Sequence, residues 1–168
     1  TLTGPIHAGG GIDIQAGMNG VATPSGYGGD LSIGGSLTAD AGMGVSLLAK
    51  GGSVEHGDLT QSAGTIYGST VTVNGLRNVV LNGNLTAGTG MLNVTAGDTM
   101  MMGYGGNLTV GSGTLQGYGG VLLAATNADG HGAAVARRSA RKSSTAAAAC
   151  SRTFTRCCGP GAIPNSCT

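Results

Sequence analysis

Large aromatic side chains are nearly absent from this sequence, which has no tryptophan, one phenylalanine and four tyrosines. A buried core must therefore consist of leucine, isoleucine, valine, methionine and alanine, which suits a narrow interior. Cysteine is absent from residues 1 to 130, and all four cysteines follow later in the chain. Disulfide bonds therefore cannot stabilise the part of the chain that precedes them.

Charged residues are also scarce and unevenly distributed. Residues 1 to 130 hold all seven acidic residues but only Lys50 and Arg77 among the basic ones, so their formal charge is −5. We expect no nucleic-acid partner. No apolar run approaches the roughly 20 residues of a membrane-spanning helix, and the N-terminus lacks the basic and apolar segments of a signal peptide. Because Thr1 is not a start methionine, we expect a piece of a longer protein that could not be exported alone.

Apolar residues do not recur three and four positions apart, as they would on one face of a helix. They occur instead as short pairs. In "MLNVTAGDTMMMGYGGNLTVGSG", residues 91 to 113, apolar residues stand two apart and each pair ends at a glycine. Side chains two apart share one face of a strand, whereas each glycine would weaken a helix by roughly 1 kcal/mol. Ten members of such pairs are predicted to point inward: Leu31, Ile33, Val71, Val73, Val79, Leu81, Leu92, Val94, Leu108 and Val110.

Equivalent pairs recur at a nearly constant interval. The intervals are Val71 to Leu92, 21; Val79 to Met100, 21; Leu85 to Leu108, 23; Leu92 to Leu115, 23; and Met100 to Val121, 21. A period in the range of about 20 to 50 residues is typical of a solenoid. Three short strands per repeat would form one coil, and coils would stack in parallel about 4.8 Å apart.

The sequence therefore predicts an all-β protein, a parallel β-helix with about 21–23 residues per coil and about six coils over residues 1–131. The repeat drifts before residue 70, where Val54 to Val71 is only 17. Stability would come from the stacking of many coils, because each coil contacts only its neighbours.

Three stretches resemble the repeats of the filamentous haemagglutinin family of large bacterial exoproteins: "GGGIDIQAG", "NLTAGTGMLNVTAGDTMMM" and "GGNLTVGSGTLQG". They share that family's pattern of Leu/Ile-x-Val/Leu followed by Ala-Gly and a turn, over residues 1 to about 130. The resemblance implies a right-handed β-helical stalk that is exported by two-partner secretion to the medium or the bacterial surface. It implies an outer-membrane secretion pore as a partner of the full-length parent, and ligands on host cells or matrix.

The function expected from this resemblance is that of a non-enzymatic structural segment of a virulence-associated adhesin. Two alternatives are a fragment of a β-helical polysaccharide lyase or hydrolase and the stalk of a contact-dependent toxin exoprotein. A glycosidase needs two carboxylates about 5 to 9.5 Å apart. The acids lie instead beside glycine-rich turns, where Asp commonly bonds its own backbone; they are Asp13, Asp30, Asp40, Asp58 and Asp98. We predict no catalytic residue and no cofactor.

Metal and phosphate sites are not expected either. The segment "GYGGDLSIGG" approaches a calcium-binding nonapeptide, but the glycine spacing before Asp30 is wrong and the motif is not repeated in tandem. Calcium needs six or more oxygen ligands, which one carboxylate per coil cannot supply. His7, His56 and His131 are isolated beside glycines, and no G-x-G-x-x-G phosphate loop is present.

Two further residue types stand out in the turns. Tyr27, Tyr104 and Tyr118 each occur in "GYGG", which indicates a turn residue and, alternatively, a ring that stacks on a sugar. Tyr67 is the remaining tyrosine.

The triplets that begin at Asn84, Asn93 and Asn107 have the Asn-x-Thr form of glycan acceptors. Their alternative explanation is an asparagine that ends a turn before a strand threonine.

Residues 132–168 differ in character from the rest. They hold six of the eight basic residues, the only phenylalanine and no acid. The cysteines Cys150, Cys157, Cys158 and Cys167 lack the C-x2-4-C spacing of a zinc site, and a disulfide framework would allow three connectivities. A basic tail can bind nucleic acid or anionic lipid, but no helical face or interleaved aromatic supports that reading. We predict a disordered tail and interpret it as a frameshift product, which would make the chain a truncated remnant.

Overall fold

The computed structural model describes residues 1–17, 29–50, 57–97, 106–126 and the backbone of residues 135–137. Their regular secondary structure consists of fifteen short strands, β1 to β15. Among these residues there is no helix of the length and apolarity that crossing a membrane requires. The predicted all-β class is thereby confirmed for the described part of the chain.

The strands form three parallel sheets of five strands each. Sheet A consists of β3 (Leu31–Ile33), β6 (Leu59–Gln61), β9 (Val79–Leu81), β12 (Leu108–Val110) and β15 (Val135–Arg137). Sheet B consists of β1 (Ile6–Ala8), β4 (Leu37–Ala39), β7 (Thr65–Gly68), β10 (Asn84–Ala87) and β13 (Leu115–Gly117). Sheet C consists of β2 (Ile12–Ala16), β5 (Val45–Ala49), β8 (Val71–Gly75), β11 (Leu92–Ala96) and β14 (Val121–Ala125).

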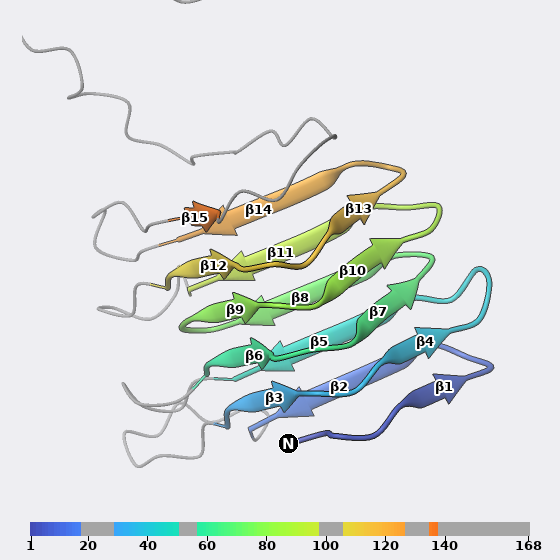
Figure 1. Cartoon of the computed structure of the whole chain (residues 1–168), viewed down its shortest axis with the longest axis horizontal. Helices are drawn as coiled ribbons and strands as arrows, with labels where there is room; N and C mark the ends of the chain where they lie inside the picture. The colour runs from blue at the N-terminus through green and yellow to red at the C-terminus, as the bar shows by residue number, and fades with distance from the viewer. Residues whose placement is uncertain (18–28, 51–56, 98–105, 127–134, 138–168) are drawn as a thin grey trace, which may run out of the picture.

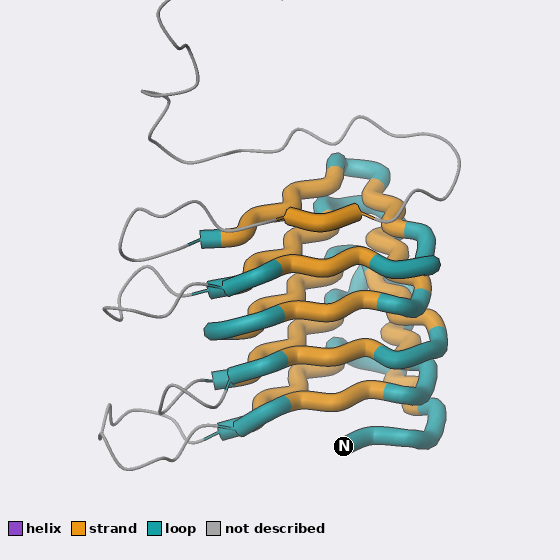
Figure 2. The backbone as a smooth tube through the Cα atoms, turned by 60° about the vertical axis from the view of Figure 1, so that its left-hand side comes forward, coloured by secondary structure: helices purple, strands orange, loops and turns teal. Residues whose placement is uncertain are grey.

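Consecutive strands visit sheets B, C and A in rotation, so three strands complete one coil (Figure 1). The coils stack directly on one another, as the backbone tube in Figure 2 shows. This arrangement is a parallel β-solenoid, as the repeat predicted.

The coil length differs from the prediction. Val71 pairs with Leu92, which is the expected interval of 21. Most other coils are longer: Leu92 pairs with Val121, and Val79 pairs with Leu108, so the interval is 29 in both cases. An interval of about 29 therefore replaces the predicted 21–23 in much of the solenoid. Each sheet has five strands, where about six coils were expected.

The physical reason lies in the connections from sheet C to sheet A. This connection is three residues, 76–78, between β8 and β9, but eleven residues, 97–107, between β11 and β12. Met100, which the prediction paired with Val79 and Val121, belongs to the longer connection and lies outside the described residues. Leu115 pairs with Leu85, not with Leu92. Periodicity alone could not reveal that the connection after β11 is longer than the connection after β8.

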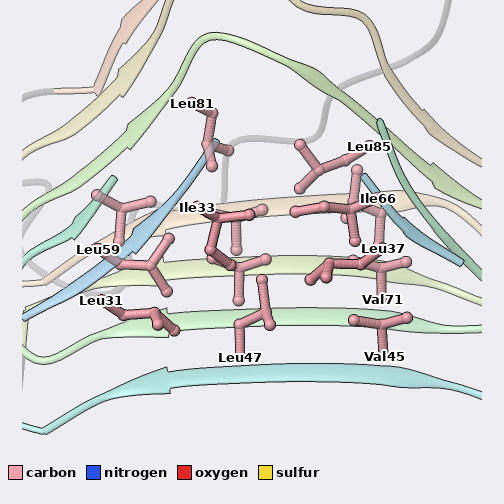
Figure 3. Packing of buried hydrophobic residues seen from close by; sticks show 14 of the residues in the cluster. Leu31, Ile33, Leu37, Val45, Leu47, Leu59, Ile66, Val71, Leu81 and Leu85 are labelled. Carbon is pink, nitrogen blue, oxygen red and sulfur yellow. The ribbon is translucent and has the colours of Figure 1, made fainter. Parts of the chain in front are cut away.

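The core is a column of aliphatic side chains enclosed by the three sheets (Figure 3). All ten residues predicted to point inward are buried, each with 5% or less of its surface exposed. Five further large side chains in the column are completely buried: Leu37, Leu47, Leu59, Ile66 and Leu85. Each such side chain contributes roughly 1.5–3 kcal/mol relative to exposure.

Some inward positions need a residue without a side chain. Gly75 ends β8 at a corner, where an added Cβ would lie 2.7 Å from Val79 Cγ2 and 2.8 Å from Asn78 O. A larger residue would push β9 away from the corner.

Strand pairing continues past residue 131, where the domain boundary was expected. Val135–Arg137 forms β15 and pairs with β12, with Val135 opposite Leu108. The other residues of the 132–168 segment, including the four cysteines, lie outside the described residues. The disorder and frameshift interpretations of that segment stay predictions.

One polar side chain is buried within the aliphatic column. Gln61 is fully buried and stands in register between Ile33 and Leu81. Its Nε2 donates to the carbonyl oxygens of Gly64 and Asn84 at 3.3 and 3.4 Å, whereas Oε1 has no hydrogen-bond partner. An unpaired buried acceptor costs about 1–3 kcal/mol.

We predict that Leu85→Ala lowers the free energy of unfolding by about 2–5 kcal/mol, because it opens a cavity in the column. The control is Thr86→Ala on the same strand, whose side chain faces outward and whose loss should change stability by at most about 0.5 kcal/mol. Urea unfolding followed by far-ultraviolet circular dichroism measures both. Equal effects of the two substitutions would contradict the inward assignment of Leu85.

We further predict that Gln61→Leu raises the free energy of unfolding by about 1 kcal/mol, because it removes the unpaired oxygen and matches its aliphatic neighbours. Of the two carbonyls it leaves, that of Gly64 lies in the connection before β7 and also accepts from Asn84 N at 3.0 Å, and that of Asn84 belongs to the first residue of β10. Gln61→Ala should instead destabilise the protein through a cavity. A destabilisation by leucine as large as that by alanine would show that the amide is essential.

Candidate functional site

A ladder of polar residues runs up the corner between sheets C and A. Its members each directly precede a strand of sheet A: Asp30, Asp58, Asn78 and Asn107. Asp30 Oδ1 accepts hydrogen bonds from the backbone N–H groups of Gly57 and Asp58 at 2.9 and 3.0 Å. Asp58 Oδ1 accepts from Asn78 N, and Asn78 Oδ1 accepts from Asn107 N, both at 3.1 Å. The side chains of Asp30, Asp58 and Asn78 thus each bond the backbone of the next coil.

The main chain bonds the same coils in the opposite sense. Leu31 N donates to Asp58 O at 2.9 Å, and Leu59 N donates to Asn78 O at 2.8 Å. Short Asp and Asn side chains suit this position because they reach backbone groups close to them. The ladder therefore fixes the register at the corner where the connecting loops vary most in length.

Asp58 has the densest set of contacts in the ladder. Arg77 Nε donates to Asp58 Oδ1 at 2.7 Å, and Arg77 Nη2 donates to Oδ2. Asn78 Nδ2 donates to Oδ1 at 3.0 Å. The two charged side chains are 29% and 28% exposed.

The hydrogen bonds from Arg77 lower the pKa of the Asp58 carboxyl below its ordinary value of 3.8, with help from the Asn78 N–H and the positive charge of Arg77, although partial burial opposes the shift. Asp58 is therefore charged at neutral pH.

The other described acids lie elsewhere on the solenoid. Asp13 is exposed on β2, and its Oδ2 accepts from Gln15 Nε2 at 3.1 Å. Asp40 follows β4, and its Oδ1 lies 2.8 Å from His7 Nε2. Within the described ranges no group of three or more His, Cys, Asp or Glu residues could hold a metal ion. Asp98, His56 and His131 fall outside those ranges.

An open hollow of about 310 Å³ lies over the outer face of sheet A, beside the ladder. It is lined by Asp58, Thr60, Asn78, Val80, Asn107 and Thr109. A second hollow, of about 420 Å³, lies over the first residues of β2, β5 and β8. Hydroxyl, amide and carboxylate groups of this kind can hydrogen-bond a polar ligand.

The three asparagines of the Asn-x-Thr triplets differ in their surroundings. Asn84 Oδ1 accepts from Thr114 N at 2.9 Å, so this side chain joins two coils. Asn93 faces outward on β11, in register with Thr72 and Leu122. Asn107 is exposed, and within the described part of the chain its amide group makes no hydrogen bond. Their glycosylation stays a prediction.

The described tyrosines lie near the corner between sheets B and C. Tyr67 faces outward on β7, and Tyr118 lies in the turn between β13 and β14 with 73% of its surface exposed. Tyr27 and Tyr104 are outside the described residues. Sequence reasoning missed Met43 and Met91, which are exposed in turns at the same corner. The available signal was a methionine next to a turn glycine, outside any apolar pair.

No protein-family model, curated protein or solved structure matches this chain. The solenoid is therefore established by the register of its strands. Membership of the filamentous haemagglutinin family stays a prediction that rests on the repeat pattern.

We predict that Asp58→Ala lowers the free energy of unfolding by about 1–2 kcal/mol at pH 7, because it removes charge-assisted hydrogen bonds that partial exposure weakens. Since the pKa is lower in the folded state, this contribution is fully present above about pH 3.8 and is lost as the pH falls through the folded-state pKa. Urea unfolding of both proteins from pH 7 to pH 2 should show the difference shrinking below pH 4.

The matched control for this prediction is Asp13→Ala, which removes an exposed carboxylate with one side-chain contact. It should change stability by no more than about 0.5 kcal/mol. An Asp58→Ala effect that does not vary between pH 7 and pH 2 would contradict the role given to the charge.

Proposed function

We propose that this chain is a non-enzymatic structural segment of a secreted or surface-exposed bacterial adhesin, a right-handed β-helical stalk of the filamentous haemagglutinin type. The observation that carries the proposal is the uninterrupted parallel stacking of coils around an aliphatic column. In such a solenoid each coil contacts only its neighbours, so further coils lengthen a rod without changing its cross-section. Length and stiffness are the properties that a stalk needs.

The placement of the acids supports a structural role over catalysis. The carboxylates of Asp30 and Asp58 accept hydrogen bonds from backbone and side-chain groups of the next coil. Asp13 and Asp40 lie on other parts of the surface, each beside a different partner. A glycosidase pairs an acid with a second carboxylate across a cleft, and the bonded aspartates of the ladder are poorly suited to proton transfer.

The composition supports export through a partner pore of the outer membrane. The absence of cysteine before residue 131 leaves that part of the chain free of covalent cross-links that would hinder threading. Coils could then form one after another outside the cell, because each needs only the coil before it.

Binding of the purified chain to cultured epithelial cells and to extracellular matrix tests the proposal. We expect saturable binding to at least one of them, which persists in Asp13→Asn and Asp30→Asn. We also expect no new reducing ends or unsaturated products from a panel of plant, bacterial and animal polysaccharides. Circular dichroism of each variant verifies that its strands have formed.

Two results would overturn the proposal. One is the absence of binding to every cell and matrix surface at micromolar concentration. The other is cleavage of a polysaccharide that an Asp13 or Asp30 substitution abolishes, which would establish the lyase or hydrolase alternative.

A further inference from the structure

The large apolar side chains that are exposed in the described residues gather at one corner of the solenoid. They are Met43, Tyr67, Met91 and Tyr118, with exposed fractions of 44%, 39%, 43% and 73%. Each belongs to a different one of four successive coils, in or next to the connection from sheet B to sheet C. These connections stack on the right of Figure 1. We call the four side chains the apolar stripe.

The turns that carry the stripe are bonded to one another along the solenoid axis. Ser69 N donates to Met43 O at 2.6 Å, Gly90 N to Ser69 O at 2.8 Å, and Gly119 N to Gly90 O at 2.9 Å. The turns therefore stack about 4.8 Å apart, a rise per coil of the order of one sugar unit in an extended chain. Each of the four coils contributes one large apolar side chain at its own position: Tyr67 stands on β7 in register with Thr38 and Thr86, and the other three lie in the turns.

The glycine residues at this corner add no side chains of their own to the surface. A Cβ added at Gly88 would lie 2.9 Å from Tyr67 Oη and 3.5 Å from Tyr67 Cε2. One edge of the Tyr67 ring therefore rests against the backbone of the next coil. A side chain at residue 88 would displace the ring. Beside it, Ser69 Oγ and Thr89 Oγ1 lie 2.7 Å apart and are both near the surface.

Charge argues against an anionic partner. The charged groups at this corner are Asp40 and its neighbour His7, whereas Lys50 and Arg77 stand in the connections from sheet C to sheet A. Nucleic acids and anionic lipid surfaces are bound through clusters of lysine and arginine. The described part of this corner offers no such cluster.

The size of the stripe argues against a second copy of the chain. Each partner of a stable protein complex buries about 800 Å². Aromatic side chains bury about 150–250 Å² each when fully covered. Four side chains that are already partly covered supply roughly half the area that a dimer needs. A narrow, linear ligand fits this surface better.

We propose that the apolar stripe binds a neutral polysaccharide strand that lies along the solenoid axis. Tyr67 and Tyr118 stack against the apolar faces of sugar rings, Met91 contacts the strand in the coil between them, and Met43 extends the surface by one coil beyond Tyr67. The hydroxyls of Ser69 and Thr89 contact sugar hydroxyls. Sugar rings present C–H faces and hydroxyl edges in alternation, which matches a surface of rings and hydroxyls. The inference rests on the proposed adhesin function and names the class of ligand.

Affinity electrophoresis of the full chain in gels that contain laminarin, dextran, hydroxyethyl cellulose or heparin tests the proposal. We expect at least one neutral polysaccharide to retard the protein and heparin not to do so. The double variant Tyr67→Ala/Tyr118→Ala should bind about tenfold more weakly or worse, because it removes both stacking surfaces. Tyr67→Phe/Tyr118→Phe, which keeps the rings, should bind within about threefold of the original chain.

Two further variants locate the site and guard against misfolding. Gly88→Ala leaves every tyrosine in place but displaces the Tyr67 ring, so it should also weaken binding. Thr60→Ala/Thr109→Ala alters the outer face of sheet A and should leave binding unchanged. The unfolding midpoint of each variant, measured by circular dichroism, shows that the solenoid is retained.

The proposal is overturned if no neutral polysaccharide retards the protein, if heparin alone does, or if the tyrosine-to-alanine variant binds as before. Loss of binding in the Thr60/Thr109 variant would move the site to the hollow over sheet A. Cell binding that persists in the tyrosine-to-alanine variant, with polysaccharide binding lost, would separate the stripe from adhesion. Polysaccharide binding without cell or matrix binding would support the stripe and contradict the adhesin function.

Discussion

In-register pairing of parallel strands is the constraint on which this structure depends. Every strand of sheets A, B and C bonds the equivalent strand of a neighbouring coil, so a residue's position in its strand decides what lies above and below it. Leu47 stands between Ile14 and Val73 for this reason. A shift of one residue would turn the buried face of a strand to solvent. The aliphatic column and the register therefore stabilise each other.

The three corners of the solenoid differ in the length of their connections and in the side chains that they carry. The connections from sheet A to sheet B have two to four residues, and those from sheet B to sheet C have two to five. The connections from sheet C to sheet A have three to fourteen residues and account for the variation in coil length. The Asp and Asn ladder lies at this variable corner, where side-chain bonds restore the register after each loop. Four successive coils each expose one large apolar side chain in or next to the short turns at the corner between sheets B and C.

The same feature thus serves both stability and the proposed function. The carboxylates of the ladder accept hydrogen bonds between coils, and these bonds help to hold the coils together. Carboxylates that are bonded in this way are poorly suited to acid–base chemistry. The corner between sheets B and C has shorter turns, and large apolar side chains are exposed on its surface. A solenoid with one corner reinforced by the ladder and one corner that carries the apolar stripe is consistent with the proposed structural adhesin and its proposed uncharged, linear ligand.

The sequence by itself determined the solenoid class and the two inward residues in each of five of the fifteen strands, β3, β8, β9, β11 and β12. Leu-x-Val pairs report which side chains share a face, because that relation depends only on neighbours in the chain. Periodicity could not determine the coil length, because the connections from sheet C to sheet A differ in length, with three residues between β8 and β9 but eleven between β11 and β12. The contacts of Asp58 with Arg77, and the gathering of Tyr67, Met43 and Met91 at one corner, were decided only by the tertiary structure. They join residues whose separation varies with every loop, so only the stacking of coils brings them together.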